Sequence, residues 1–151
     1  MGNKSDEAKQ LFLSGANCAQ AVLGAFHQEC EMDFDAAMRL TSGFGAGMGR
    51  LREVCGAVSG MFMAASLIRG TSKYNDKTAK DAHYALIQEL AGEFRKETGS
   101  LICRELLGLE KKQEDRPVSE ARTTEYYTKR PCVEMVALAA RILEEKLVSK
   151  S

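Results

Sequence analysis

Cysteine is the residue type with which this sequence could carry out chemistry. The chain of 151 residues has five cysteines, and four of them stand where a helix is predicted to begin: Cys18, Cys55, Cys103 and Cys132. The first turn of a helix exposes free N–H groups and the positive end of the helix dipole, and both favour a thiolate over a thiol. A thiolate is the nucleophile in disulfide exchange and a ligand for soft metals. The four cysteines therefore predict redox or metal chemistry.

The surroundings of these cysteines favour a shared site. Basic residues stand close to them in sequence and would lower the thiol pKa values further: Arg50, Arg52, Arg104, Lys129 and Arg130. Cys18 and Cys132 also each head an apolar stripe of the predicted helix. If the helix starts lie at one end of a bundle, we expect these stripes to bring the thiols together.

Plain packing is the competing interpretation of the cysteines. Cysteine behaves as a small hydrophobe and is among the most buried residue types. No CxxC pair occurs and the gaps between the cysteines are long, so the sequence has neither a thioredoxin-like motif nor a zinc-ribbon spacing. Cys30 lies between Glu29 and Glu31, which raise its pKa, and we treat it as a bystander.

Glycines beside Cys55 stand where a helix disfavours them. Gly56 and Gly60 each cost a helix about 1 kcal/mol relative to alanine. Their spacing either lets another helix pack closely or lets a cofactor reach the backbone near the Cys55 sulfur. The preceding loop, 45–50, has the composition of a phosphate cradle, but it follows a predicted helix and not a strand, so no dinucleotide site is expected. We expect a tight turn that brings Cys55 to its partners, with Arg50 at most as an anion contact.

The elements that must position these residues are helices. Apolar residues recur with helical spacing, while strand-like alternation is almost missing. We predict one all-α domain over 1–151, a bundle of about five to seven helices near 5–13, 18–29, 33–40, 53–68, 77–98, 101–107 and 131–148. The expected caps of the second, fifth and sixth helices are Asn17, Asp76 and Ser100. The polar stretch 110–130 is interpreted as a surface excursion, with Tyr126 and Tyr127 as surface anchors more than as a cover for a site.

Composition limits the kind of partner. Lysine plus arginine and aspartate plus glutamate number 21 each, so the chain lacks the broad positive field that nucleic-acid binding requires, and no nucleic-acid partner is expected. The start of the chain has no apolar signal segment, and the most apolar segment, Val54 to Ile68, is shorter than the ~20 residues of a bilayer span. We expect no membrane insertion and a cytoplasmic location, where reducing conditions favour catalytic or metal-binding thiols over structural disulfides.

Four motifs, in this order, resemble one protein family. They are GANCAQAV at 15–22, FGAGMGRLREVCGAVSG at 44–60, GSLICRELLG at 99–108, and the cysteine at position 132. The pattern is similar to that of the prokaryotic redox-active proteins that are named for four cysteines and a CGAxxG motif. The resemblance spans nearly the whole chain. It implies that Cys18, Cys55, Cys103 and Cys132 belong together, with Gly56 and Gly60 as the motif glycines, and it implies a redox role without a substrate or a cofactor.

Three functions are open at this point. In the leading hypothesis the chain is a thiol-dependent oxidoreductase, in which two of the four thiols cycle to a disulfide and the accessible Cys55 is the attacking thiolate. In the second hypothesis, the same four cysteines hold zinc or an iron–sulfur cluster. In the third, the cysteines are inert and the chain is a structural or interaction module. The partner is an unknown redox protein or small molecule, and the helix with small residues is suited to a homodimer.

Overall fold

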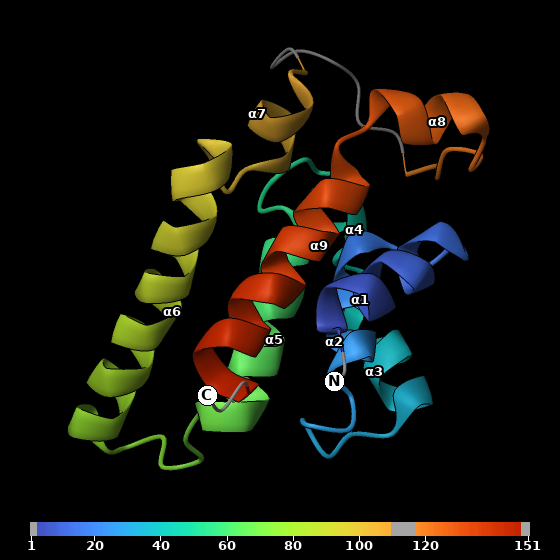
Figure 1. Ribbon diagram of the computed structural model, residues 1–151. Coiled ribbons are helices and arrows are strands. Elements are labelled where there is room, and N and C mark those ends of the chain that lie inside the picture. The colour runs from blue at the N-terminus through green and yellow to red at the C-terminus, as the bar shows by residue number, and fades with distance from the viewer. Residues whose placement is uncertain (1–2, 110–116, 149–151) are drawn as a thin grey trace.

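The computed structural model describes residues 3–109 and 117–148, and this part of the chain is all-α, as predicted. The helices, labelled in Figure 1, are α1 Lys4–Leu13, α2 Cys18–Ala25, α3 Phe34–Thr41, α4 Gly45–Met48, α5 Gly56–Arg69, α6 Lys77–Thr98, α7 Cys103–Leu107, α8 Thr124–Lys129 and α9 Cys132–Leu143. A π-helical turn, Glu144–Val148, continues α9. The short α4 and α8 lie within the predicted loop and excursion, and the other helices correspond to those predicted from the sequence.

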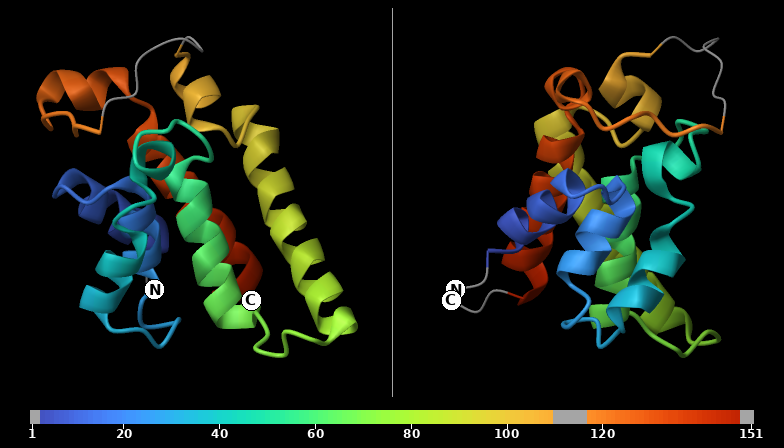
Figure 2. Two further views of the ribbon diagram at one scale, coloured as in Figure 1. Left: turned by 180° about the vertical axis from the view of Figure 1, so that it is seen from behind. Right: turned by 90° about the vertical axis from the view of Figure 1, so that its right-hand side faces the viewer.

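The centre of the bundle is the pair α5 and α9. Figures 1 and 2 show α1 and α2 on one side of this pair and the long α6 on the other, with α7 and α8 at the end where α9 begins. The largest fully buried side chains come from several helices and include Phe12, Phe26, Phe94, Leu23 and Leu143. Among the described residues, no helix is both long and apolar enough to cross a membrane.

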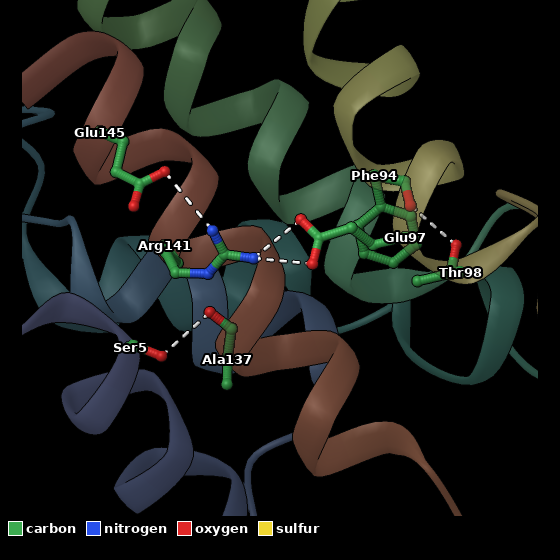
Figure 3. Close-up of polar contacts among 7 residues, drawn as sticks. All are labelled: Ser5, Phe94, Glu97, Thr98, Ala137, Arg141 and Glu145. Carbon is green, nitrogen blue, oxygen red and sulfur yellow. Dashed lines mark hydrogen bonds and ion pairs between the residues drawn. The ribbon is translucent and has the colours of Figure 1, made fainter.

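Polar contacts attach α9 to its neighbours on both sides, as Figure 3 shows. The Arg141 guanidinium donates to both carboxylate oxygens of Glu97 on α6, at 3.0 and 2.8 Å. On the other side, the Ser5 hydroxyl of α1 donates to the carbonyl of Ala137 at 3.0 Å. These contacts link α1 and α6 to α9, and the apolar core supplies the main stabilisation.

Side-chain caps fix where α2, the helix of Cys18, and α6 begin. The Asn17 side chain accepts from the Gln20 N–H at 2.8 Å while the Gln20 side chain accepts from the Asn17 N–H at 2.9 Å, the predicted capping box. The predicted cap at Asp76 is also present on α6. The predicted cap at Ser100 is wrong, because Ile102 is the N-cap residue of α7, and the Ser100 hydroxyl, two residues earlier, accepts from the Ile102 N–H.

The glycine-rich loop before α5 is a left-handed turn. Backbone φ angles are positive at Ala46 (55°), Met48 (71°) and Arg50 (71°), where a side chain costs roughly 1–2 kcal/mol per residue. Gly47 shares this conformation, and a Cβ on it would meet the Arg52 Cα at 2.6 Å and the Cys103 Cβ at 2.7 Å. The turn therefore presses the chain before Cys55 against the start of α7, which is the tight turn that the sequence predicted.

The motif glycines of α5 let it pack closely on α2. A Cβ on Gly60 would meet the Ala19 carbonyl oxygen at 2.8 Å, and a Cβ on Gly56 would meet the Cys18 Cβ at 3.1 Å. Real Cβ atoms do not tolerate the shorter contact, so α2 would have to move away. Close helix packing, one of the two interpretations of these glycines, therefore accounts for both of them.

The described part of the excursion, 117–130, is fastened to α1. The Arg122 guanidinium donates to the carbonyls of Phe12 and Ala16, each at 2.9 Å, and its centre lies 4.5 Å from the Phe12 ring centroid. The Tyr127 hydroxyl donates to the Leu13 carbonyl at 3.4 Å, so this tyrosine is a surface anchor as predicted. Residues 110–116 of the predicted excursion lie outside the described residues.

Candidate functional site

One cavity of about 390 Å³ has all four predicted cysteines in its wall: Cys18, Cys55, Cys103 and Cys132. It lies at the end of the bundle where α2, α5, α7 and α9 begin. Cys18, Cys103 and Cys132 are the first residues of their helices, and Cys55 is the N-cap residue of α5. The structure therefore brings together four thiols that are far apart along the chain.

Backbone pairing holds Cys55 and Cys103 on neighbouring segments. Val54 and Ile102 form an isolated antiparallel bridge. The Cys55 N–H donates to the Leu101 carbonyl at 2.8 Å, and the Cys103 N–H donates to the Glu53 carbonyl at 2.6 Å. Because these bonds flank the bridge on both sides, the starts of α5 and α7 are fixed against each other.

Cys18 and Cys132 form the second pair, and their side chains are hydrogen-bonded. The Cys18 thiol donates to the Cys132 sulfur, and this bond is the main reason that the pKa of Cys132 is lowered to about 7 although burial acts in the opposite direction. Positive charge on Arg130, Arg52 and Arg122 adds to the effect. The same bond, with burial, raises the pKa of Cys18 well above its ordinary value. Cys132 is half-buried and Cys18 is buried, so the thiolate belongs on Cys132.

The other two thiols in the cavity are neutral because burial dominates. Burial raises the pKa of Cys55 to about 12, although the backbone N–H groups of Ala57 and Val58 act to lower it. Burial also raises the pKa of Cys103, against the opposing effect of Arg52, whose guanidinium donates to the Cys103 sulfur at 3.7 Å. The predicted thiolate at Cys55 is therefore wrong. The predicted accessibility of Cys55 is wrong as well, since its residue is only 6% exposed.

Arginines give the cavity its positive charge, and the sequence located only some of them. Arg50, Arg52 and Arg130 line the cavity as their positions near the cysteines suggested, whereas Arg104 does not. Arg122 lies in the cavity wall too, and the sequence analysis missed it. No sequence signal could have identified it, because it reaches the site through contacts with α1, more than 100 residues earlier in the chain.

Tyr126 covers part of the cavity. It lines the wall, and burial raises its pKa to about 12, so its hydroxyl stays protonated. The Arg122 guanidinium lies 5.1 Å from its ring centroid and the Arg130 guanidinium 5.9 Å, which are distances of cation–π contacts. Of the two neighbouring tyrosines, Tyr127 is thus the anchor, and Tyr126 covers the cavity, the role that the sequence analysis ranked second.

Other residues singled out from the sequence divide between the cavity and the core. Gly56 lines the cavity, whereas Gly60 lies outside its wall and packs on α2. Cys30 is buried away from the cavity with its sulfur 3.8 Å from the Ala64 carbonyl oxygen. Burial, assisted by Glu29, raises the pKa of Cys30 to about 11, in agreement with its interpretation as a bystander.

The arrangement of these thiols does not fit a metal centre. A structural zinc or iron–sulfur site needs thiolates that converge on one point. Among residues 3–109 and 117–148, no three His, Cys, Asp or Glu side chains are placed to hold a metal ion together.

Comparison with known proteins gives a family. No curated protein and no solved structure matches the chain significantly. A family model described as "Putative redox-active protein (C_GCAxxG_C_C)" matches residues 16–146, which include all four cavity cysteines and both motif glycines. The chain therefore belongs to the C_GCAxxG_C_C family.

Proposed function

We propose that this protein exchanges thiols and disulfides, with Cys132 as the attacking thiolate and Cys18 as the resolving thiol. The observation that carries the proposal is that these two side chains meet in one cavity, beside arginines that favour a charged sulfur on Cys132. The pKa of Cys132, about 7, is close to ambient pH, where an attacking thiol combines thiolate content with nucleophilicity best. Membership of a redox-active family supports the same class of reaction.

The exchange follows from the positions of the two sulfurs. The Cys132 thiolate attacks one sulfur of a substrate disulfide, which forms a mixed disulfide and releases the other half as a thiolate. That thiolate takes the proton of Cys18, whose sulfur then attacks the Cys132 sulfur and releases the second half. The protein ends with a Cys18–Cys132 disulfide, and two electrons have reduced the substrate S–S bond to one thiol and one thiolate, which takes a proton from water.

Cys55 and Cys103 contribute in a different way. Both have raised pKa values and are buried, so at neutral pH they are neutral thiols in the cavity wall. A neutral wall adds no negative charge that would repel the Cys132 thiolate. Cys132 is therefore the single attacking thiolate among the four cysteines, and the reaction needs no second thiolate.

Mild oxidation of the reduced full-length protein tests the proposal. One equivalent of 2-hydroxyethyl disulfide is expected to remove two of the five thiols, and peptide mapping is expected to find a Cys18–Cys132 disulfide. Cys132→Ser is expected to abolish this reaction, while Cys30→Ser, the control outside the cavity, retains it. Oxidation that involves Cys30, or that gives a mixture of pairs, contradicts the proposal.

Two rival functions have distinct outcomes with the same preparation. A stoichiometric amount of zinc or iron in anaerobically purified protein would favour metal binding. Thiols that react only after unfolding would favour an inert structural module, because plain packing is then sufficient to explain the cysteines.

A further inference from the structure

Three arginines of the cavity meet at one carboxylate. The Oε1 atom of Glu120 lies 3.7 Å from an Arg50 nitrogen and 4.0 Å from an Arg52 nitrogen, and it forms an ion pair with Arg130. All four residues line the cavity that contains Cys132. Glu120 is thus a carboxylate shared by three guanidinium groups of the cavity, and this concentration of positive charge favours the binding of an anion.

Arg52 has the features of a built anion site. Its residue is only 6% exposed, and a buried guanidinium is costly unless its donors are satisfied. Within the part of the chain that the structure describes, the buried Nε atom of Arg52 has no hydrogen-bond acceptor. Its terminal nitrogens reach the Cys103 sulfur at 3.7 Å and Glu120 at 4.0 Å, both long contacts. A carboxylate entering the cavity would give this group a close partner.

We propose that the cavity binds a small disulfide that carries a carboxylate, and that this carboxylate takes the place of Glu120 on Arg50 and Arg52. A guanidinium group binds a planar carboxylate through two parallel hydrogen bonds, whereas a lysine ammonium binds it only as a point charge. The volume of about 390 Å³ lies within the range of small-molecule sites. This inference rests on the proposed exchange at Cys132 and names its class of substrate.

Glu120 is suited to be displaced. Its side chain is 39% exposed, whereas those of the three arginines are exposed by 21% (Arg50), 6% (Arg52) and 20% (Arg130), so the carboxylate is the solvated member of the cluster. Its release into water costs less than the burial of an unpaired arginine. The reaction itself is unchanged: the Cys132 thiolate attacks the substrate S–S bond, Cys18 resolves the mixed disulfide, and two carboxylated thiols leave.

Three small disulfides that differ in charge test this substrate class. They are 3,3′-dithiodipropionate, which is anionic, 2-hydroxyethyl disulfide, which is neutral, and cystamine, which is cationic. For each disulfide, the rate of oxidation of the reduced protein is divided by the rate of its reaction with a simple thiol. This ratio removes differences in intrinsic reactivity among the three disulfides. We expect the anionic disulfide to be faster than the neutral one by about tenfold at low salt, and the cationic one to be slowest.

Variants of the arginine cluster then locate the effect. Arg50→Gln is expected to reduce the anionic-to-neutral ratio toward one, and Arg52→Lys, which keeps the charge but not the planar fork, is expected to reduce it partly. Glu120→Gln is expected to raise the ratio, because the competing carboxylate is removed. Glu134→Gln, an exposed glutamate in the first turn of α9 outside the cavity wall, is the matched control and is expected to leave the ratio unchanged.

Binding of suberate separates this inference from the proposed function. Suberate is the analogue of dithiodipropionate with two methylene groups in place of the sulfurs, so it can bind but cannot react. Suberate that binds to wild type in calorimetry, more tightly to Glu120→Gln and more weakly to Arg50→Gln, supports the anion site even if no disulfide reacts. Equal normalised rates for the three disulfides, with no suberate binding, overturn the inference and leave the exchange chemistry standing.

Discussion

The two cysteine pairs of the cavity share a local setting but differ in charge state. Cys18 and Cys132 begin α2 and α9, and Cys55 and Cys103 stand at the starts of α5 and α7. The pKa is lowered only at Cys132 and raised at the other three. A helix start is therefore not sufficient to make a thiolate in this protein.

Burial and neighbours explain the difference between the pairs. Two backbone N–H groups favour a thiolate at Cys55, yet burial outweighs them and its pKa rises to about 12. Cys103 has Arg52 beside it and its pKa is still raised. Cys132 has the Cys18 thiol and three arginines beside it and is half-buried. Only at Cys132, therefore, do the interactions that favour a thiolate outweigh desolvation.

The largest expected effect is the contrast in reactivity between Cys132 and Cys55. At pH 7 a thiol with a pKa of about 7 is half ionised, whereas one with a pKa of about 12 has a thiolate fraction of roughly 10⁻⁵. We expect iodoacetamide to alkylate Cys132 at least about a thousandfold faster than Cys55 in the native protein. Peptide mapping of a labelling time course measures both rates, with Cys30 as the internal buried reference. Alkylation of Cys55 faster than that of Cys132 would contradict the difference in charge state between the two pairs.

Gly60→Ala tests the packing that joins the two pairs. The added Cβ would lie 2.8 Å from the Ala19 carbonyl oxygen of α2, so we expect a loss of about 2 kcal/mol in the free energy of unfolding. Gly92→Ala on α6 is the matched control, because nothing lies within 4 Å of its added Cβ, and there alanine is expected to stabilise by about 1 kcal/mol. Urea unfolding of both variants measures the difference. A neutral result for Gly60→Ala would mean that α2 and α5 can separate at little cost.

Arg130→Met tests the role of positive charge at Cys132. In wild type, the alkylation rate of Cys132 is expected to rise about tenfold per pH unit below pH 7 and to level off above it. Removal of Arg130 is expected to move this profile to higher pH by about one unit. Arg95→Met, on the exposed face of α6, is the control. An unchanged profile in Arg130→Met would show that Arg130 does not lower the pKa of Cys132, and would leave Cys18, Arg52 and Arg122 as the causes.

The same pKa shift links stability to pH. The folded-state pKa of Cys132 is below its ordinary value, so the thiolate contributes stability that is fully present above the ordinary pKa and is lost as the pH falls through about 7. For Cys55 the sign is opposite, because a raised pKa means that stability is lost as the pH rises above the ordinary thiol value. We expect the free energy of unfolding to lose its increase with pH in Cys132→Ser and its decrease with pH in Cys55→Ser. Measurement of the free energy of unfolding of both variants over this pH range tests the expectation.

Local patterns made much of this arrangement predictable. Helical periodicity and the cap at Asn17 depend on residues a few positions apart, so the sequence predicted helix starts at Cys18 and Cys132 correctly. The glycine loop and the small residues of α5 likewise indicated a tight turn and close packing. These predictions agree with the structure because each feature depends on residues within one helix or turn, or on the helix packed directly against it.

The charge states were not predictable because they depend on distant contacts. The depth at which Cys55 is buried follows from the bridge between Val54 and Ile102, which no local pattern reveals. The arginine cluster depends on Glu120, and the positive charge near Cys132 comes in part from Arg122. Both residues belong to a polar stretch that looks like any solvated surface in the sequence. Desolvation and long-range ion pairing thus determine which cysteine has the lowered pKa. The prediction of Cys55 as the attacking thiolate was wrong because neither effect can be read from the sequence.

The smallest expected effect concerns the cap that sets the position of Cys18. Asn17→Ala removes the capping box of α2 and is expected to cost about 1 kcal/mol of stability. Asp76→Ala removes the comparable cap of α6, far from the cysteines, and is expected to cost a similar amount. Because Cys18 follows Asn17 directly and donates to Cys132, only Asn17→Ala is expected to raise the pKa of Cys132. Equal alkylation profiles for the two variants would show that the Cys18–Cys132 contact is held by the core and not by the start of its helix.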